Sequence, residues 1–130
     1  MQLNRRRILY AEDNLDIRIP VCLLLRLSDI EVITTDNMTQ ALRLAQCERF
    51  DLYLLDTRLP DGLGTELCQK IRAFDRETPI LFFSAAGRED DKQRAKRCGA
   101  QGYLTKPDGL DKLPETILDL INQPRNLTEH

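Results

Sequence analysis

Five polar side chains stand at the ends of short apolar segments of the sequence, where they could act together. They are Glu12, Asp13, Asp56, Ser84 and Lys106. Three carboxylates held close together repel one another, so at pH 7 one of them must be protonated or a cation must neutralise them. Carboxylates in an open site favour Mg²⁺, with Mn²⁺ as an alternative, because these ions take oxygen ligands and Mg²⁺ keeps several waters for a phosphate partner.

The lysine and the serine of this set suit a phosphoryl group. Lys106 would supply a positive charge and Ser84 a hydrogen bond. An aspartate can itself be the nucleophile in phosphoryl transfer, which gives an aspartyl phosphate. The set therefore predicts metal-assisted transfer of a phosphoryl group to an aspartate.

Each of these residues also has an ordinary explanation when it is taken alone. The two acids before Asn14 could form a capping turn for the next helix, for which Asp16 is the more usual cap. Asp56 could be a turn residue before "LPDG", Ser84 could cap a helix, and Lys106 could be a surface lysine. A shared function is favoured because the five residues fall at successive ends of expected strands.

Apolar segments that favour strands alternate with amphipathic segments that favour helices. The expected strands cover residues 6–12, 31–35, 51–56, 79–84 and 102–105, and the expected helices cover residues 21–28, 38–47, 63–74, 88–98 and 113–121. This alternation predicts an α/β fold with a parallel sheet covered on both faces, and right-handed crossovers favour a doubly wound sheet. Ligands bind such a sheet beyond the carboxyl ends of its strands, so the five side chains are expected to converge there.

The expected helix at residues 88–98 differs from the others in composition. It offers little to a core beyond Ala95 and Cys98, and most of its other residues are charged. We therefore predict a surface helix that is weakly anchored and free to move.

Composition limits the class of protein. The chain has 130 residues, 42% of them apolar, and a net charge of −2. These values predict one globular domain without a general attraction to nucleic acid. The longest apolar runs are too short to span a bilayer, and from their composition the N-terminal residues are not expected to form a signal peptide.

The cysteines do not suggest a metal site. Cys22, Cys47, Cys68 and Cys98 form no closely spaced pair, and the only histidine is His130. This spacing excludes an ordinary structural zinc site and favours reduced cysteines in a cytoplasmic protein.

Four stretches carry a specific resemblance to a known family. They are "LYAEDN", "LLDTRLPDGLG", "PILFFSAAG" and "GAQGYLTKP". In order and spacing they resemble the receiver domain of the response regulators of bacterial two-component signalling (CheY-like). The resemblance implies a five-stranded parallel sheet of order 2-1-3-4-5 flanked by five helices, as in flavodoxin and CheY. It implies a single receiver domain at residues 1–130, with a core at about residues 6–122.

The resemblance also implies roles for individual residues. Asp56 would be the phosphoacceptor. Mg²⁺ would bind the carboxylates of Glu12, Asp13 and Asp56, with the backbone carbonyl of Arg58 as a further ligand. Glu12 stands where aspartate is commoner in the family, and its longer side chain favours coordination through water.

Three further residues would act after transfer. Ser84 would donate a hydrogen bond to the phosphoryl group, and Lys106 would form an ion pair with it. Tyr103 matches the switch aromatic, whose ring moves inward when Ser84 shifts. The peptide between Lys106 and Pro107 would be cis. The surface that changes would be formed by the fourth helix, the fifth strand and the fifth helix, at residues 88–98, 102–105 and 113–121.

The resemblance implies a phosphoacceptor and switch rather than a turnover enzyme. The donor would be a phosphohistidine of a sensor histidine kinase or a phosphotransfer protein. The downstream protein or output domain is unknown, and neither nucleic acid nor membrane is an expected partner. A homodimer through the changing surface is compatible with the resemblance. The chain is either a stand-alone receiver or part of a longer regulator or hybrid kinase.

Three alternatives start from the same residues. A phosphatase of the dehalogenase type needs an acid two residues after its nucleophile, where Arg58 stands. A flavin-binding module would need a loop rich in Ser, Thr and Gly in place of residues 12–14. A receiver-like docking module that no longer takes phosphate is the remaining alternative.

Overall fold

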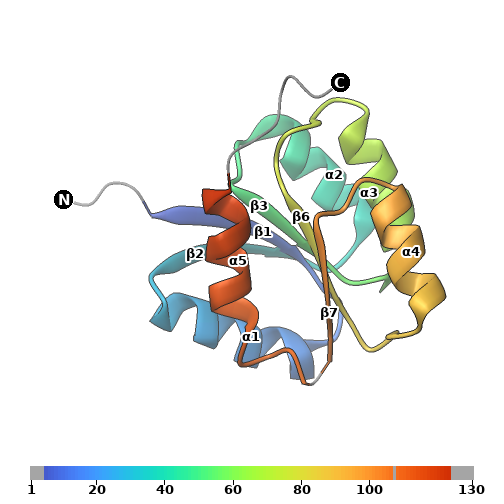
Figure 1. Ribbon diagram of the computed structural model, residues 1–130. Coiled ribbons are helices and arrows are strands. Elements are labelled where there is room, and N and C mark those ends of the chain that lie inside the picture. The colour runs from blue at the N-terminus through green and yellow to red at the C-terminus, as the bar shows by residue number, and fades with distance from the viewer. Residues whose placement is uncertain (1–4, 107, 124–130) are drawn as a thin grey trace.

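The computed structural model describes residues 5–106 and 108–123, in which five parallel strands form one sheet with helices on both faces (Figure 1). The strands of the sheet are β1 (Arg6–Ala11), β2 (Ile30–Thr35), β3 (Leu52–Leu55), β6 (Ile80–Ser84) and β7 (Gly102–Thr105). Their order is β2-β1-β3-β6-β7, and every neighbouring pair is parallel. Counted along this sheet alone, the order is the predicted 2-1-3-4-5.

The helices lie in two layers. They are α1 (Leu15–Leu27), α2 (Met38–Cys47), α3 (Gly64–Arg72), α4 (Glu89–Arg97) and α5 (Leu113–Asn122). The first of two apolar clusters joins the sheet to α2, α3 and α4, and the second joins it to α1 and α5. Along β1, Leu9 packs into the first cluster and Tyr10 into the second, as alternation in a strand requires. None of the helices within the described residues is long and apolar enough to cross a membrane.

Two helix boundaries differ from the sequence predictions. The cap of α1 is Asn14, whose side chain accepts a hydrogen bond from the backbone N–H of Asp16 at 2.9 Å. Asp16 is therefore not the cap; it lies in the first turn, where its negative charge suits the helix dipole. In α3 only the middle of the predicted apolar face is buried, because Leu63 and Phe74 lie beyond the helix ends and are exposed.

Helix α4 is anchored at one end. Within the helix only Ala95 is buried, as its charged composition predicted. Its C-terminal end is held by α3, because Arg72 donates two hydrogen bonds to the carbonyl of Gly99, at 3.1 and 2.9 Å. The thiol of Cys68 also contacts the carbonyl of Cys98 at 3.1 Å. The predicted weak anchoring therefore applies to the body of α4 and not to its C-terminal end.

A small antiparallel hairpin follows β3. Its strands are β4 (Arg58–Leu59) and β5 (Gly62–Leu63), and the sequence patterns did not predict them. Strands of two residues are too short to show an alternating pattern. The hairpin is the connection between the end of β3 and the start of α3.

Candidate functional site

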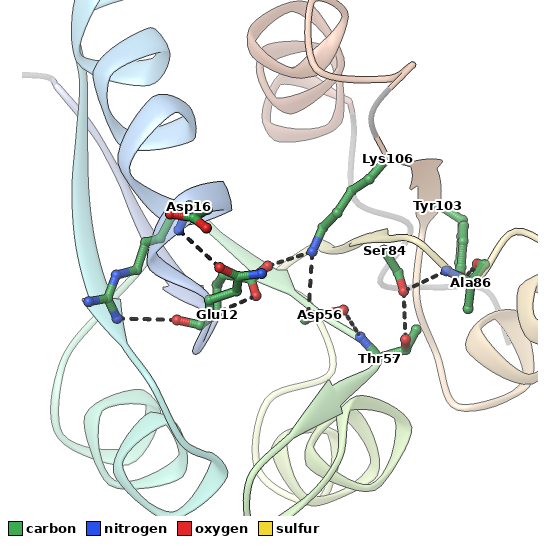
Figure 2. Close-up of polar contacts among 10 residues, drawn as sticks. Glu12, Asp16, Asp56, Thr57, Ser84, Ala86, Tyr103 and Lys106 are labelled. Carbon is green, nitrogen blue, oxygen red and sulfur yellow. Dashed lines mark hydrogen bonds and ion pairs between the residues drawn. The ribbon is translucent and has the colours of Figure 1, made fainter.

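The carboxyl ends of four strands bring the predicted polar residues to one cleft. Figure 2 shows four of them, Glu12, Asp56, Ser84 and Lys106. The lining of this cleft includes Glu12, Asp13, Asp56, Ser84 and Lys106. The prediction that these five side chains converge on one edge of the sheet is therefore confirmed. Asn14 and Ile17 of the α1 region, Thr57, the hairpin residues 58–60 and Ala85–Ala86 form the rest of the lining.

The acids form a compact cluster. Glu12, Asp13 and Asp56 each offer a carboxylate oxygen, and these three oxygens lie within 4.8 Å of one another. Glu12 is almost fully buried, the side chain of Asp56 is 14% exposed, and Asp13 is exposed. Oxygen ligands on an open cleft match the needs of a hard divalent cation, so the residues present could hold one.

Lys106 neutralises part of this negative charge. Its Nζ donates a hydrogen bond to Glu12 Oε1 at 2.6 Å and lies 3.4 Å from Asp56 Oδ2. Burial raises the pKa of the Glu12 carboxyl above its ordinary value, while the hydrogen bond from Lys106 lowers it and the charge of Asp56 raises it again. The side chain of Lys106 is only 10% exposed and lies beside both carboxylates. The lysine is thus their internal counter-ion.

Asp56 is fixed on one side and open on the other. Its backbone N–H donates to the carbonyl of Ala11 at 3.2 Å, and its Oδ1 accepts a hydrogen bond from the N–H of Thr57 at 2.7 Å. Among the residues that the structure describes, Oδ2 has one contact, the longer one to Lys106. One carboxylate oxygen of Asp56 is therefore oriented by the backbone, and the other faces the cleft.

Gly64 allows the chain to pass close behind Asp56. A Cβ atom at Gly64 would collide with the backbone carbonyl oxygen of Asp56 and would lie 2.8 Å from the ring of Phe82. Both neighbours are well fixed, because Phe82 is fully buried and Asp56 is bonded to β1. Glycine is therefore required where α3 begins.

Ser84 is connected to a residue that sequence analysis did not single out. Its hydroxyl lies 2.6 Å from that of Thr57 and accepts a hydrogen bond from the N–H of Ala86 at 3.1 Å. The phenol of Tyr103 donates to the carbonyl of the same Ala86, and its ring stacks on Phe82 with the centroids 6.0 Å apart. Ser84 and Tyr103 are therefore linked by hydrogen bonds to the backbone of the same residue, Ala86 (Figure 2).

The register of the hairpin decides where the carbonyl of Arg58 points. Arg58 pairs with Leu63, and the next pair back is bonded, because the N–H of Gly64 donates to the carbonyl of Thr57 at 2.8 Å. Bonded and non-bonded pairs alternate in antiparallel strands, so Arg58–Leu63 is a non-bonded pair. The carbonyl of Arg58 is consequently directed away from its partner strand.

Two sequence expectations cannot be placed in this geometry. Pro107 lies outside the described residues, and so does the expected cis peptide before it. The inward movement of Tyr103 stays a prediction, since one arrangement of the ring does not show a movement.

Comparison with known proteins identifies the family. The family model of the response regulator receiver domain matches residues 8–118. The chain is a response regulator receiver domain. The family and the fold predicted from the sequence are thereby confirmed, and so is a phosphoacceptor function in two-component signalling at the level of the family.

Curated relatives of this receiver domain are longer proteins. The response regulator protein PilR of Pseudomonas aeruginosa is 35% identical over 115 residues, which are 88% of this chain and 26% of PilR. The cell cycle response regulator CtrA of Brucella ovis is 33% identical over 119 residues, which are 92% of this chain and 51% of CtrA. The receiver domain thus spans between about a quarter and a half of the length of these relatives.

Solved structures share its fold. Chemotaxis protein CheY4 of Vibrio cholerae has a TM-score of 0.81 at 30% identity, over 90% of this chain and 99% of that one. The receiver domain of sensor histidine kinase PA1611 of Pseudomonas aeruginosa has a TM-score of 0.85 at 29% identity, over 92% of this chain and 100% of that one. In the PA1611 structure a magnesium ion is coordinated in the active site cleft.

Proposed function

We propose that this receiver domain, with a core at residues 6–122, accepts a phosphoryl group on Asp56 from a phosphohistidine of a sensor histidine kinase or phosphotransfer protein. The observation that carries the proposal is the state of the Asp56 carboxylate. Oδ1 is held by the N–H of Thr57, while Oδ2 faces the cleft 3.4 Å from the Nζ of Lys106. A nucleophile needs this combination of fixed orientation and an accessible lone pair.

The acidic cluster would hold Mg²⁺, and Mn²⁺ would fit the same oxygen ligands. The ligands would be the carboxylates of Glu12, Asp13 and Asp56 and the backbone carbonyl of Arg58. The register of the hairpin supports this last ligand, because it leaves the carbonyl of Arg58 without a partner in the opposite strand. When bound, the ion supplies positive charge that offsets the charge of the transferring group.

The transfer forms one bond and breaks one bond. Asp56 Oδ2 would attack phosphorus, and the bond from phosphorus to the imidazole nitrogen of the donor would break, so that its electron pair stays on the donor histidine. Lys106 already lies beside Oδ2 and would pair with the new phosphoryl oxygens. Ser84 would exchange its contact with Thr57 for one with the phosphoryl group.

The switch would be transmitted through Ala86. When Ser84 turns toward the phosphoryl group, its bond from the N–H of Ala86 is lost and the contact of Tyr103 with the carbonyl of Ala86 changes. Movement would then reach α4, β7 and α5, the surface that a downstream protein or output domain would read. The chain would act as substrate and switch in the cytoplasm, without turnover of its own.

The acetyl phosphate reaction tests the proposed function. Incubation of the protein with acetyl phosphate and Mg²⁺ is expected to raise its intact mass by one phosphoryl group, because the small donor needs no docking surface. With a chelator in place of Mg²⁺, the mass is expected to stay unchanged. A protein that gains no phosphoryl group in either condition would instead be a docking module that no longer takes phosphate.

An exposed apolar stripe on α1 suggests where the donor protein binds. Leu15, Ile19, Leu23 and Leu27 recur every fourth residue, and they are 53%, 62%, 60% and 78% exposed. The stripe begins beside Asn14 and Ile17, which line the cleft. A partner that delivers a phosphohistidine to Asp56 must approach the cleft and would cover the residues at its edge. We therefore include the stripe in the proposal as the docking surface for the donor.

Charged substitutions in the stripe test this surface. Ile19→Glu and Leu23→Glu are each expected to slow transfer from a phosphorylated donor protein about tenfold or more, because a carboxylate would be buried in an apolar contact. Phosphorylation by acetyl phosphate should not change. Phe74→Glu, at an exposed apolar residue just beyond α3, is the control. Equal transfer to all three variants and the wild type would place the donor elsewhere.

A further inference from the structure

The tip of the β4–β5 hairpin is bonded to the first turn of α2. The carboxylate of Asp61 accepts three hydrogen bonds from that turn. They come from the N–H of Met38 at 2.6 Å, the N–H of Thr39 at 3.0 Å and the hydroxyl of Thr39 at 2.8 Å. Asp61 and Met38 are 23 positions apart in the sequence. The contact therefore joins two separate segments of the fold.

Asp61 completes the cap of α2. The first N–H groups of a helix have no partner inside the helix. Asn37 accepts the hydrogen bond of Gln40 through its side chain, and Asp61 accepts those of Met38 and Thr39. These bonds from the backbone hold the pKa of Asp61 well below its usual range, at about 2. The carboxylate is therefore charged at neutral pH, as the positive end of the helix dipole favours.

The same hairpin carries the carbonyl proposed to bind the cation. Arg58 lies three residues before Asp61, and both belong to a unit closed by the pairs Arg58–Leu63 and Leu59–Gly62. Gly62, next to Asp61, also packs against the side chain of Met38, as the lack of space for a Cβ there shows. The position of the hairpin relative to Asp56 is consequently determined at two places, by the end of β3 and by the start of α2.

We propose that Asp61 is a positioning residue, which holds the hairpin against α2 and so keeps the carbonyl of Arg58 in place for the divalent cation. This inference rests on the proposed function, because it requires that a cation binds at the acidic cluster. Coupling between two sites is reciprocal. If the contact of Asp61 tightens cation binding, cation binding must by the same factor protect the N–H groups of Met38 and Thr39.

The affinity for Mg²⁺ is the first test. Asp61→Asn keeps the size of the side chain but loses its charge and one acceptor oxygen, so we expect the dissociation constant for Mg²⁺ to rise about tenfold. Calorimetric titration of the folded protein measures it. Asp36→Asn is the matched control, because Asp36 lies beside the same helix start and loses the same charge, while its carboxylate binds only the side chain of Asn37 within the described residues. A purely structural cap would leave both dissociation constants at the wild-type value.

Hydrogen exchange of the wild type is the second test, and it does not depend on the folding of a variant. With saturating Mg²⁺, exchange of the Met38 and Thr39 amides is expected to slow by the same factor as the change in affinity, while amides at the C-terminal end of α2 keep their rates. Unchanged exchange at both amides would overturn the inference even though Mg²⁺ binds. If the wild type binds no Mg²⁺, the proposed cation site itself fails, and this inference fails with it.

Discussion

Asp56→Asn is expected to abolish phosphorylation by acetyl phosphate at every Mg²⁺ concentration. The amide oxygen that replaces Oδ2 carries no full negative charge and is a poor nucleophile, and the neighbouring Glu12 is held in its buried ion pair with Lys106. The intact mass of the variant should remain that of the unmodified protein after incubation.

The fold of this variant should survive, which makes the result interpretable. The backbone N–H of residue 56 donates to the carbonyl of Ala11, and the carbonyl of Thr57 accepts from the N–H of Gly64, so neither bond involves the lost charge. Lys106 also keeps its shorter contact, at 2.6 Å, to Glu12. Asp119→Asn, at an exposed position of α5, is the control and should be phosphorylated like the wild type. Phosphorylation of Asp56→Asn at the wild-type level would mean that another residue is the acceptor.

Lys106→Met is expected to destabilise the protein by about 3 kcal/mol when a chelator keeps divalent cations away. Removal of the lysine leaves Glu12, which is 1% exposed, without its counter-ion and next to Asp56. A buried carboxylate without a partner costs much more than an exposed one. Urea unfolding with and without chelator measures the loss.

Added Mg²⁺ should restore most of the stability of Lys106→Met, because the cation would neutralise the same carboxylates. The wild type should gain less, since its lysine already does so. Lys92→Met, an exposed lysine of α4, is the control and should change the free energy of unfolding by less than about 0.5 kcal/mol. If Mg²⁺ does not reduce the loss of stability in Lys106→Met, the lysine does not stabilise the protein by neutralising the acidic cluster.

The convergence of the site was predictable because it depends on features that are local in the sequence. Buried parallel strands are continuous apolar runs, and the first polar residues at their carboxyl ends, such as Asp56 and Ser84, must lie at the edge of the sheet. The start of α1 was less predictable. Both Asn14 and Asp16 can cap a helix, and only the backbone at residue 14 decides between them.

Other contacts of the site join residues that are distant in the sequence and close only in the folded chain. Thr57 follows Asp56 directly in the sequence, yet its contact in the site is with the hydroxyl of Ser84, which lies on another strand. Asp61 lies in the short stretch "LPDG", and its partners lie more than 20 positions earlier. Sequence periodicity carries no information on such pairs, because each half is compatible with a simple local explanation.

A helix fixed at one end moves as a lever. In α4 the fixed end is the C-terminal one, where Arg72 binds Gly99, while the N-terminal end follows the loop that contains Ala86. A small shift at Ala86 would therefore act on the free end of α4, and the displacement would decrease toward the fixed C-terminal end. The first turn, with Glu89, Asp90 and Asp91, would travel farthest, so a partner that senses this switch gains most by gripping that acidic turn.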